Sequence, residues 1–203
     1  MRKHLLASFL AFTSAAGFAA DAVRGVRFVD RTSAAWQSQQ VQEPCIVPNP
    51  RDPRKLVMLY SGVPASDRRR CDIGKAWALQ SDPFTWHEDA ANPVFSPAPG
   101  AWDSGSIRLD AVVHVPEEDA YYIYYSGTRR TVQDQIGLAI CPVGADGYSG
   151  ITPEAIRRFG DRPGLPPDPA APFHEEMASQ AAGWRERNAA DGGWNWEIGR
   201  AHV

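Results

Sequence analysis

The sequence contains few cysteines and lacks the spacings with which cysteines bind metal ions. Cys45, Cys71 and Cys141 are the three cysteines among 203 residues, and no CxxC motif occurs. An odd number of cysteines cannot all pair within one complete chain, although an exported protein can form disulfides. We therefore expect no cysteine metal site, and either buried thiols or at most one bridge.

Several other chemistries are also missing from the sequence. There is no glycine-rich phosphate loop, no Gly-x-Ser-x-Gly turn and no His-Glu-x-x-His motif. The formal net charge of −3 does not favour nucleic acid as a partner, because nucleic acid requires a clustered basic face. The basic run at 68–70 has Asp67 and Asp72 beside it, which is typical of a solvated loop. We predict no cofactor and no metal ion.

The first twenty residues have the pattern of a secretory signal peptide. Arg2 and Lys3 precede an apolar run over Leu5–Phe12, which is too short to cross a membrane. Small residues follow, so that cleavage after Ala19 or after Ala20 fits the pattern. We expect a secreted or periplasmic protein, and no later stretch is long enough for a membrane span.

The last seven residues, 197–203, match the in-frame translation of a common sequencing adapter. We therefore expect that the native sequence is interrupted near Trp196, and that His202 carries no function. The alternative is a genuine tail that matches by coincidence. Residues 21–196 are long enough for one sizeable core and are expected to form a single domain.

A repeated pattern of strands runs through this domain. An apolar run ends in Tyr-Ser-Gly at 60–62 and again at 125–127, and a strand that begins Ile-Gly follows at 73 and at 136. Tyr60 and Tyr125 are 65 residues apart. Such runs are typical of buried strands, and we place each Ser-Gly at a turn. The period suits a β-propeller blade with extended loops.

Further strands complete each repeat. One lies upstream, at 43–47 and at 110–114, and an outer strand is expected near Thr85–His87. No long stretch has helical periodicity. A third repeat begins near Phe173, with Trp194–Trp196 in register with the Tyr-Ser-Gly strands. We therefore predict an all-β fold that contains about two and a half blades of a β-propeller.

These paired motifs resemble the propeller glycoside hydrolases of families 43, 32 and 130. The segments Asn92–Phe95 and Trp102–Gly105 are similar to the links between their blades. The resemblance covers about Val41 to Trp196. It implies five blades in the complete protein and an exported hydrolase that acts on O-glycosidic bonds of a carbohydrate. By analogy with the family, a divalent cation at the centre of the propeller is the alternative to the absence of metal predicted above, although no ligand cluster requires it. Oligomeric state, sugar and linkage are not predicted.

In that family the innermost strand of each blade carries an acidic residue into a central funnel. Glu43 precedes Tyr60 by 17 residues and Asp110 precedes Tyr125 by 15, so both match this position. Because consecutive blades turn about one axis, we expect the two carboxylates to converge as glycoside cleavage requires. The alternative is that both are solvated residues at the beginnings of strands.

The third repeat departs from the family pattern. Its equivalent position lies near Gln180, which cannot act as an acid, although Glu175 or Glu176 just upstream is a candidate for the third catalytic carboxylate. Glu43 also stands where family 43 usually has aspartate. These departures favour an alternative function, a propeller that binds carbohydrate or acts as a scaffold without catalysis.

Two further residues are candidates for contact with the sugar. Trp102 precedes the Asp110 strand and offers an aromatic face to a pyranose ring, with core packing as the alternative. His114 lies four residues after Asp110 and is a candidate funnel residue, with a purely structural strand position as the alternative.

Overall fold

The computed structural model describes residues 33–129, 134–164, 181–187 and 194–200, the last two ranges by their backbone alone. The predicted signal peptide at 1–20, Glu175, Glu176, Gln180 and residues 201–203 lie outside the described residues. Within the described ranges no helix is both long and apolar enough to cross a membrane.

The described chain is all-β apart from one short 3-10 helix. Two four-stranded antiparallel sheets follow each other along the sequence, and a two-stranded hairpin follows them. The first sheet contains β1 (Gln40–Pro48), β2 (Lys55–Val63), β3 (Asp72–Leu79) and β4 (Asp82–Glu88), and η1 (Ala35–Gln37) precedes it. The second contains β5 (Ser106–Val115), β6 (Ala120–Thr128), β7 (Gln135–Pro142) and β8 (Arg157–Arg158). The hairpin consists of β9 (Ala181–Arg187) and β10 (Trp194–Arg200).

The strands agree with the predicted repeat. Each sheet is a meander in which consecutive strands are neighbours, and the expected outer strand of the first repeat is β4. The hairpin has the order expected for the beginning of a third repeat. β10 extends through residues 197–200, and the foreign origin of residues 197–203 stays a prediction.

The sequence prediction was wrong about the Ser-Gly pairs, which lie inside strands and not at turns. Gly62 pairs with Val41 and with Asp72, and β2 continues to Val63. A Cβ atom on Gly62 would lie 2.1 Å from the ring of Trp36. The glycine is therefore required for the close approach of an aromatic ring, and not for a turn.

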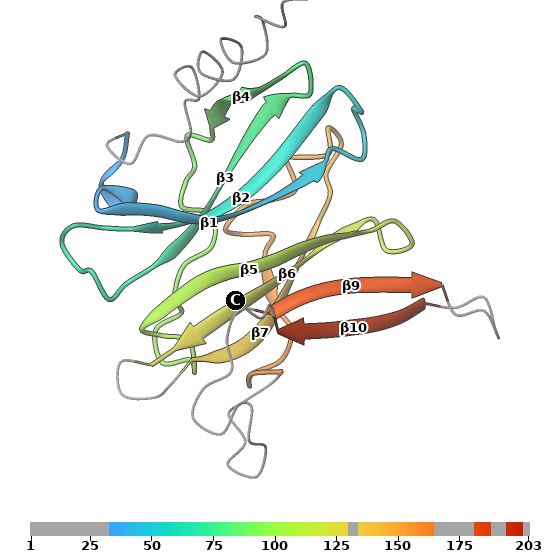
Figure 1. The fold of residues 1–203 in the computed structure, drawn as a ribbon. Helices are drawn as coiled ribbons and strands as arrows, with labels where there is room; N and C mark the ends of the chain where they lie inside the picture. The colour runs from blue at the N-terminus through green and yellow to red at the C-terminus, as the bar shows by residue number, and fades with distance from the viewer. Residues whose placement is uncertain (1–32, 130–133, 165–180, 188–193, 201–203) are drawn as a thin grey trace, which may run out of the picture.

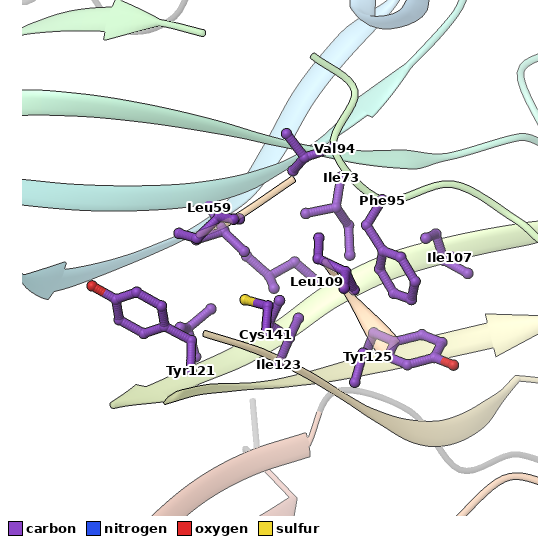
Figure 2. Packing of buried hydrophobic residues seen from close by; sticks show 14 of the residues in the cluster. Leu59, Ile73, Val94, Phe95, Ile107, Leu109, Tyr121, Ile123, Tyr125 and Cys141 are labelled. Carbon is purple, nitrogen blue, oxygen red and sulfur yellow. The ribbon is translucent and has the colours of Figure 1, made fainter. Parts of the chain in front are cut away.

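The main hydrophobic core lies between the two sheets. Figure 1 shows the first sheet (blue to green) above the second, with the β9–β10 hairpin beside the second. Side chains from both sheets meet in this core, as Figure 2 shows for Leu59 and Ile73 of the first sheet and for Leu109, Ile123 and Tyr125 of the second. The link between the sheets adds Val94 and Phe95, and backbone hydrogen bonds between Ile73 and Phe95 tie this link to β3.

The first strands of successive sheets are neighbours in space. β1 contacts β5, and β5 contacts β9. The backbone N–H of Val112 on β5 donates a hydrogen bond to Cys45 Sγ on β1, over 3.2 Å. First strands that lie side by side in this way are what a propeller requires at its centre, where side chains from different sheets can converge.

Candidate functional site

Glu43 and Asp110 occupy the same irregular place in the two first strands. The register of β1 with β2 shifts between Gln42 and Cys45, and that of β5 with β6 shifts between Leu109 and Ala111. Both carboxylate residues therefore lie in β-bulges, which turn a side chain away from the regular alternation and are common beside active sites. Glu43 also has a φ of 53°, a left-handed conformation that is strained for a residue with a Cβ atom.

Each carboxylate accepts a hydrogen bond from the serine of its own Tyr-Ser-Gly motif. Ser61 Oγ donates to Glu43 Oε2 over 2.9 Å. Ser126 Oγ lies 3.0 Å from Asp110 Oδ1 and 2.8 Å from Asp110 Oδ2. The two repeats thus build the same unit, a bulged acidic residue held by a serine of the neighbouring strand.

A further hydrogen bond connects the two units across the junction of the sheets. The backbone N–H of Leu109 donates to Ser61 Oγ over 2.9 Å, and Asp110 is the next residue in the chain. Glu43 is therefore connected to the backbone beside Asp110 through one hydroxyl group. The convergence of the two carboxylates themselves stays a prediction.

Burial and nearby charges act on Glu43 in opposite directions. Burial raises the pKa of this carboxyl group, whereas the Ser61 hydrogen bond and the positive charge of Arg108 lower it, and the negative charge of Asp134 raises it. The net result is a pKa above the ordinary value. Arg108 forms an ion pair with Asp134, so the positive charge near Glu43 is partly neutralised.

The sequence analysis missed both serines as partners of the carboxylates. The signal was present, because the same serine recurs in both repeats at nearly the same distance from the acidic residue. It was misinterpreted since Ser-Gly is common in turns. No local pattern indicated the pairing of Arg108 with Asp134, which lies in the loop after β6.

The structure places Trp102 in the core between the sheets. Its side chain is buried, and its ring stacks on Tyr125 with centroids 5.6 Å apart. The ring also covers Gly127 and Gly137. One face of the indole is therefore occupied by protein contacts, and the proposed stacking on a sugar stays a prediction.

His114 lies away from the carboxylate unit along β5. It pairs with Tyr121 near the turn between β5 and β6, and its ring lies 5.7 Å from that tyrosine ring. Four residues separate it from Asp110, about 13 Å of strand. This spacing places the backbone of His114 well away from that of Asp110 along β5, and a role for His114 with substrate stays a prediction.

The described residues contain no group of three or more His, Cys, Asp or Glu side chains that could hold a metal ion. The three cysteines are free thiols, of which Cys71 and Cys141 are buried as expected and Cys45 is partly buried. What this arrangement can supply is a pair of carboxyl groups on neighbouring inner strands, one with a raised pKa, beside an arginine.

Comparison with known proteins finds a similar all-β fold among solved structures. No family model and no curated protein matches the chain. A glycosyl hydrolase from Bacteroides ovatus superposes with a TM-score of 0.50 at 16% identity, over 76% of this chain and 40% of its own. A β-1,2-mannobiose phosphorylase from Listeria innocua, in complex with β-1,2-mannobiose, gives 0.47 at 19% identity, over 64% and 33%.

The chain therefore spans less than half the length of either of these structures. At such low identity the likeness shows the fold alone. It confirms the all-β fold that the repeats and the resemblance predicted, and it is consistent with part of a β-propeller.

Proposed function

We propose that the full-length protein is an exported glycoside hydrolase that cleaves O-glycosidic bonds in oligo- or polysaccharides. The observation that carries this proposal is the repeated unit of a bulged, serine-held carboxylate on two neighbouring inner strands. The shared fold with a glycosyl hydrolase supports it, and the N-terminal signal pattern supports export. Five blades in the complete protein are part of the same proposal.

The chemistry needs two carboxyl groups in different protonation states. One protonates the leaving oxygen, and the other activates water or attacks the sugar, with about 5–9.5 Å between the two groups. Glu43 and Asp110 are the two that we assign to this pair. The raised pKa of Glu43 suits exchange of a proton closer to neutral pH than an exposed glutamate allows. Glu176 of the third repeat is proposed as a further carboxylate of the same funnel.

A second candidate function is a propeller that binds carbohydrate without cleaving it. In the sequence, the equivalent position of the third repeat falls near Gln180, and this favours the alternative, because an amide cannot act as an acid. Carboxylates held by serines can also accept hydrogen bonds from sugar hydroxyls. Binding without turnover would therefore use the same residues.

The test is to replace each carboxylate by its amide in the full-length protein. Asp110→Asn and Glu43→Gln keep the shape of the side chain and remove its charge. We expect a loss of about 10²–10⁴-fold in kcat on a panel of aryl glycosides, with the fold intact. Glu154→Gln, in an exposed loop, is the matched control and should retain activity.

Two results would separate the alternatives. If neither amide variant reduces an activity that the wild-type protein clearly has, the assignment of these carboxylates is wrong. If the wild-type protein cleaves nothing on the panel but binds oligosaccharide, and Asp110→Asn weakens that binding, the binding propeller replaces the hydrolase.

A further inference from the structure

Ser61 is the residue at which three strands of the two sheets meet. Its side chain is fully buried on β2. It donates to Glu43 on β1 and accepts from the backbone N–H of Leu109 on β5, both over 2.9 Å. A serine hydroxyl has one hydrogen and two lone pairs. The N–H of Leu109 uses one lone pair, and an ionised glutamate can only accept, so the hydroxyl donates its hydrogen to Glu43, with the Cys71 thiol also within its hydrogen-bonding contacts.

This arrangement fixes one oxygen of Glu43. The hydroxyl of Ser61 occupies Oε2, which leaves Oε1 to exchange a proton with a ligand or with water. The backbone of Glu43 alone does not give this orientation, since glutamate has three side-chain torsions and this residue lies in a bulge. The hydrogen bond from β5 in turn holds the hydroxyl in place.

We propose that Ser61 is a positioning residue, whose hydroxyl orients the Glu43 carboxylate relative to the second sheet and to Asp110. This inference rests on the proposed function for its catalytic consequence. The positioning itself is a statement about the carboxylate, and it can be measured without any substrate.

The groups around Glu43 determine what removal of the hydroxyl should do. Two charged residues act on the pKa of Glu43, namely Arg108 of β5 and Asp134 of the loop after β6. Glu43 in turn raises the pKa of the Cys71 thiol, which lies next to β3. Of the two contributions that lower the pKa of Glu43, the Ser61 hydrogen bond is the larger. Its loss leaves burial opposed chiefly by Arg108, so the pKa of Glu43 should rise further.

Two pairs of variants test this in the full-length protein. Ser61→Ala removes the hydroxyl, and Ser149→Ala removes one from an exposed loop as the control. Ser61→Thr and Ser61→Val share a β-branched shape and differ only in whether a hydroxyl is present. If Ser61→Ala does not fold, the comparison between these two variants provides the test. Carbon-13 NMR of labelled glutamate follows the titration of Glu43, whose signal is identified by its absence in Glu43→Gln.

We expect the Glu43 titration to move to higher pH in the Ala and Val variants and to stay near the wild-type position in the Thr and Ser149→Ala variants. On a cleaved glycoside, kcat should fall by about 10- to 100-fold in the Ala and Val variants with little change in KM, and the limb of the pH profile due to Glu43 should shift in the same direction. A purely structural role would change thermal stability without moving this titration.

The inference is overturned if the titration of Glu43 is the same with and without the hydroxyl. This outcome is independent of the proposed function. If the wild-type protein cleaves no glycoside and the titration still moves as expected, the positioning role stands and the hydrolase function fails. If the protein is active and the titration does not move, the hydrolase stands and the role of Ser61 fails.

Discussion

Trp36 and Trp102 occupy equivalent positions in the two sheets, each covering a pair of glycines. The ring of Trp36 lies where Cβ atoms on Gly62 and Gly74 would be, and Trp102 has the same relation to Gly127 and Gly137. Each ring also lies against the tyrosine of its Tyr-Ser-Gly motif, with centroids 5.5 Å apart for Trp36 and 5.6 Å for Trp102. The two repeats therefore share this arrangement of tryptophan, tyrosine and glycines as well as their sequence pattern.

The glycines beneath these rings should not tolerate a side chain. In Gly137→Ala the new Cβ atom would lie 2.6 Å from the ring of Trp102 and 2.7 Å from that of Tyr125, both held in the core. We expect a loss of about 1–3 kcal/mol in the free energy of unfolding, measured by chemical denaturation. Gly164→Ala is the control, because the nearest atom there is 3.8 Å away. Equal stabilities of the two variants would contradict this packing.

Asp103 holds a buried network that ties the link between the sheets to β6 and β8. It is fully buried, and it accepts hydrogen bonds from Arg158 Nε over 2.7 Å and from the Tyr125 hydroxyl over 3.0 Å. Asp103→Asn leaves the arginine without its counter-charge. We expect a loss of about 2–4 kcal/mol, below the full cost of breaking a buried pair since Arg158 is partly exposed.

The matched control for Asp103 is Asp52→Asn, which breaks the ion pair of Asp52 with the exposed Arg54. This pair is screened by solvent and should contribute little. Denaturant unfolding of both variants provides the comparison. If both lose the same stability, the network around Asp103 does not have the assigned role.

Glu43→Gln should stabilise the protein at neutral pH. Since burial raises the pKa of Glu43 above its ordinary value of 4.5, the stability that this group contributes is present below that pH and is lost as pH rises through the higher folded-state value. Glutamine stays neutral throughout. The variant should therefore be more stable than wild type at pH 7, and this advantage should shrink as pH falls from the folded-state pKa towards 4.5.

Free energies of unfolding measured between pH 4 and pH 7 test this dependence. Glu154→Gln changes an exposed carboxylate and should show no such trend. An advantage of Glu43→Gln that stays constant with pH would exclude an effect of the charge. If Glu43 belongs to a functional site that lowers the stability of the fold, the variant should gain stability and lose activity.

The thiols of Cys71 and Cys141 should be unreactive in the folded protein. Burial raises the pKa of Cys71 to about 12 and that of Cys141 to about 12, so little thiolate exists at pH 8. Iodoacetamide at that pH should leave both unlabelled until denaturant is added. The intact mass should be the same with and without reductant, because all three cysteines are free. Rapid labelling of Cys141 under native conditions would show that the core is open.

Much of the fold could be predicted because its signals are local. Alternating and continuous apolar runs indicate strands, and a recurring order of runs indicates a recurring sheet. The strands expected at 56–62, 73–78, 121–127 and 136–140 all lie within observed strands. The Ser-Gly pairs were assigned wrongly. From the sequence alone, a glycine that leaves room for the ring of Trp36 cannot be distinguished from a glycine that forms a turn.

The sequence by itself determined the all-β class, the repeat, and the equivalence of Glu43 and Asp110, because these follow from residue types at regular spacing along the chain. Only the tertiary structure decided which atoms hold the two carboxylates. Ser61 and Leu109 are 48 residues apart and form their hydrogen bond only because the second sheet packs on the first. Partners of this kind depend on how two faces fit in three dimensions, and a buried polar group must find its partner wherever that packing places one.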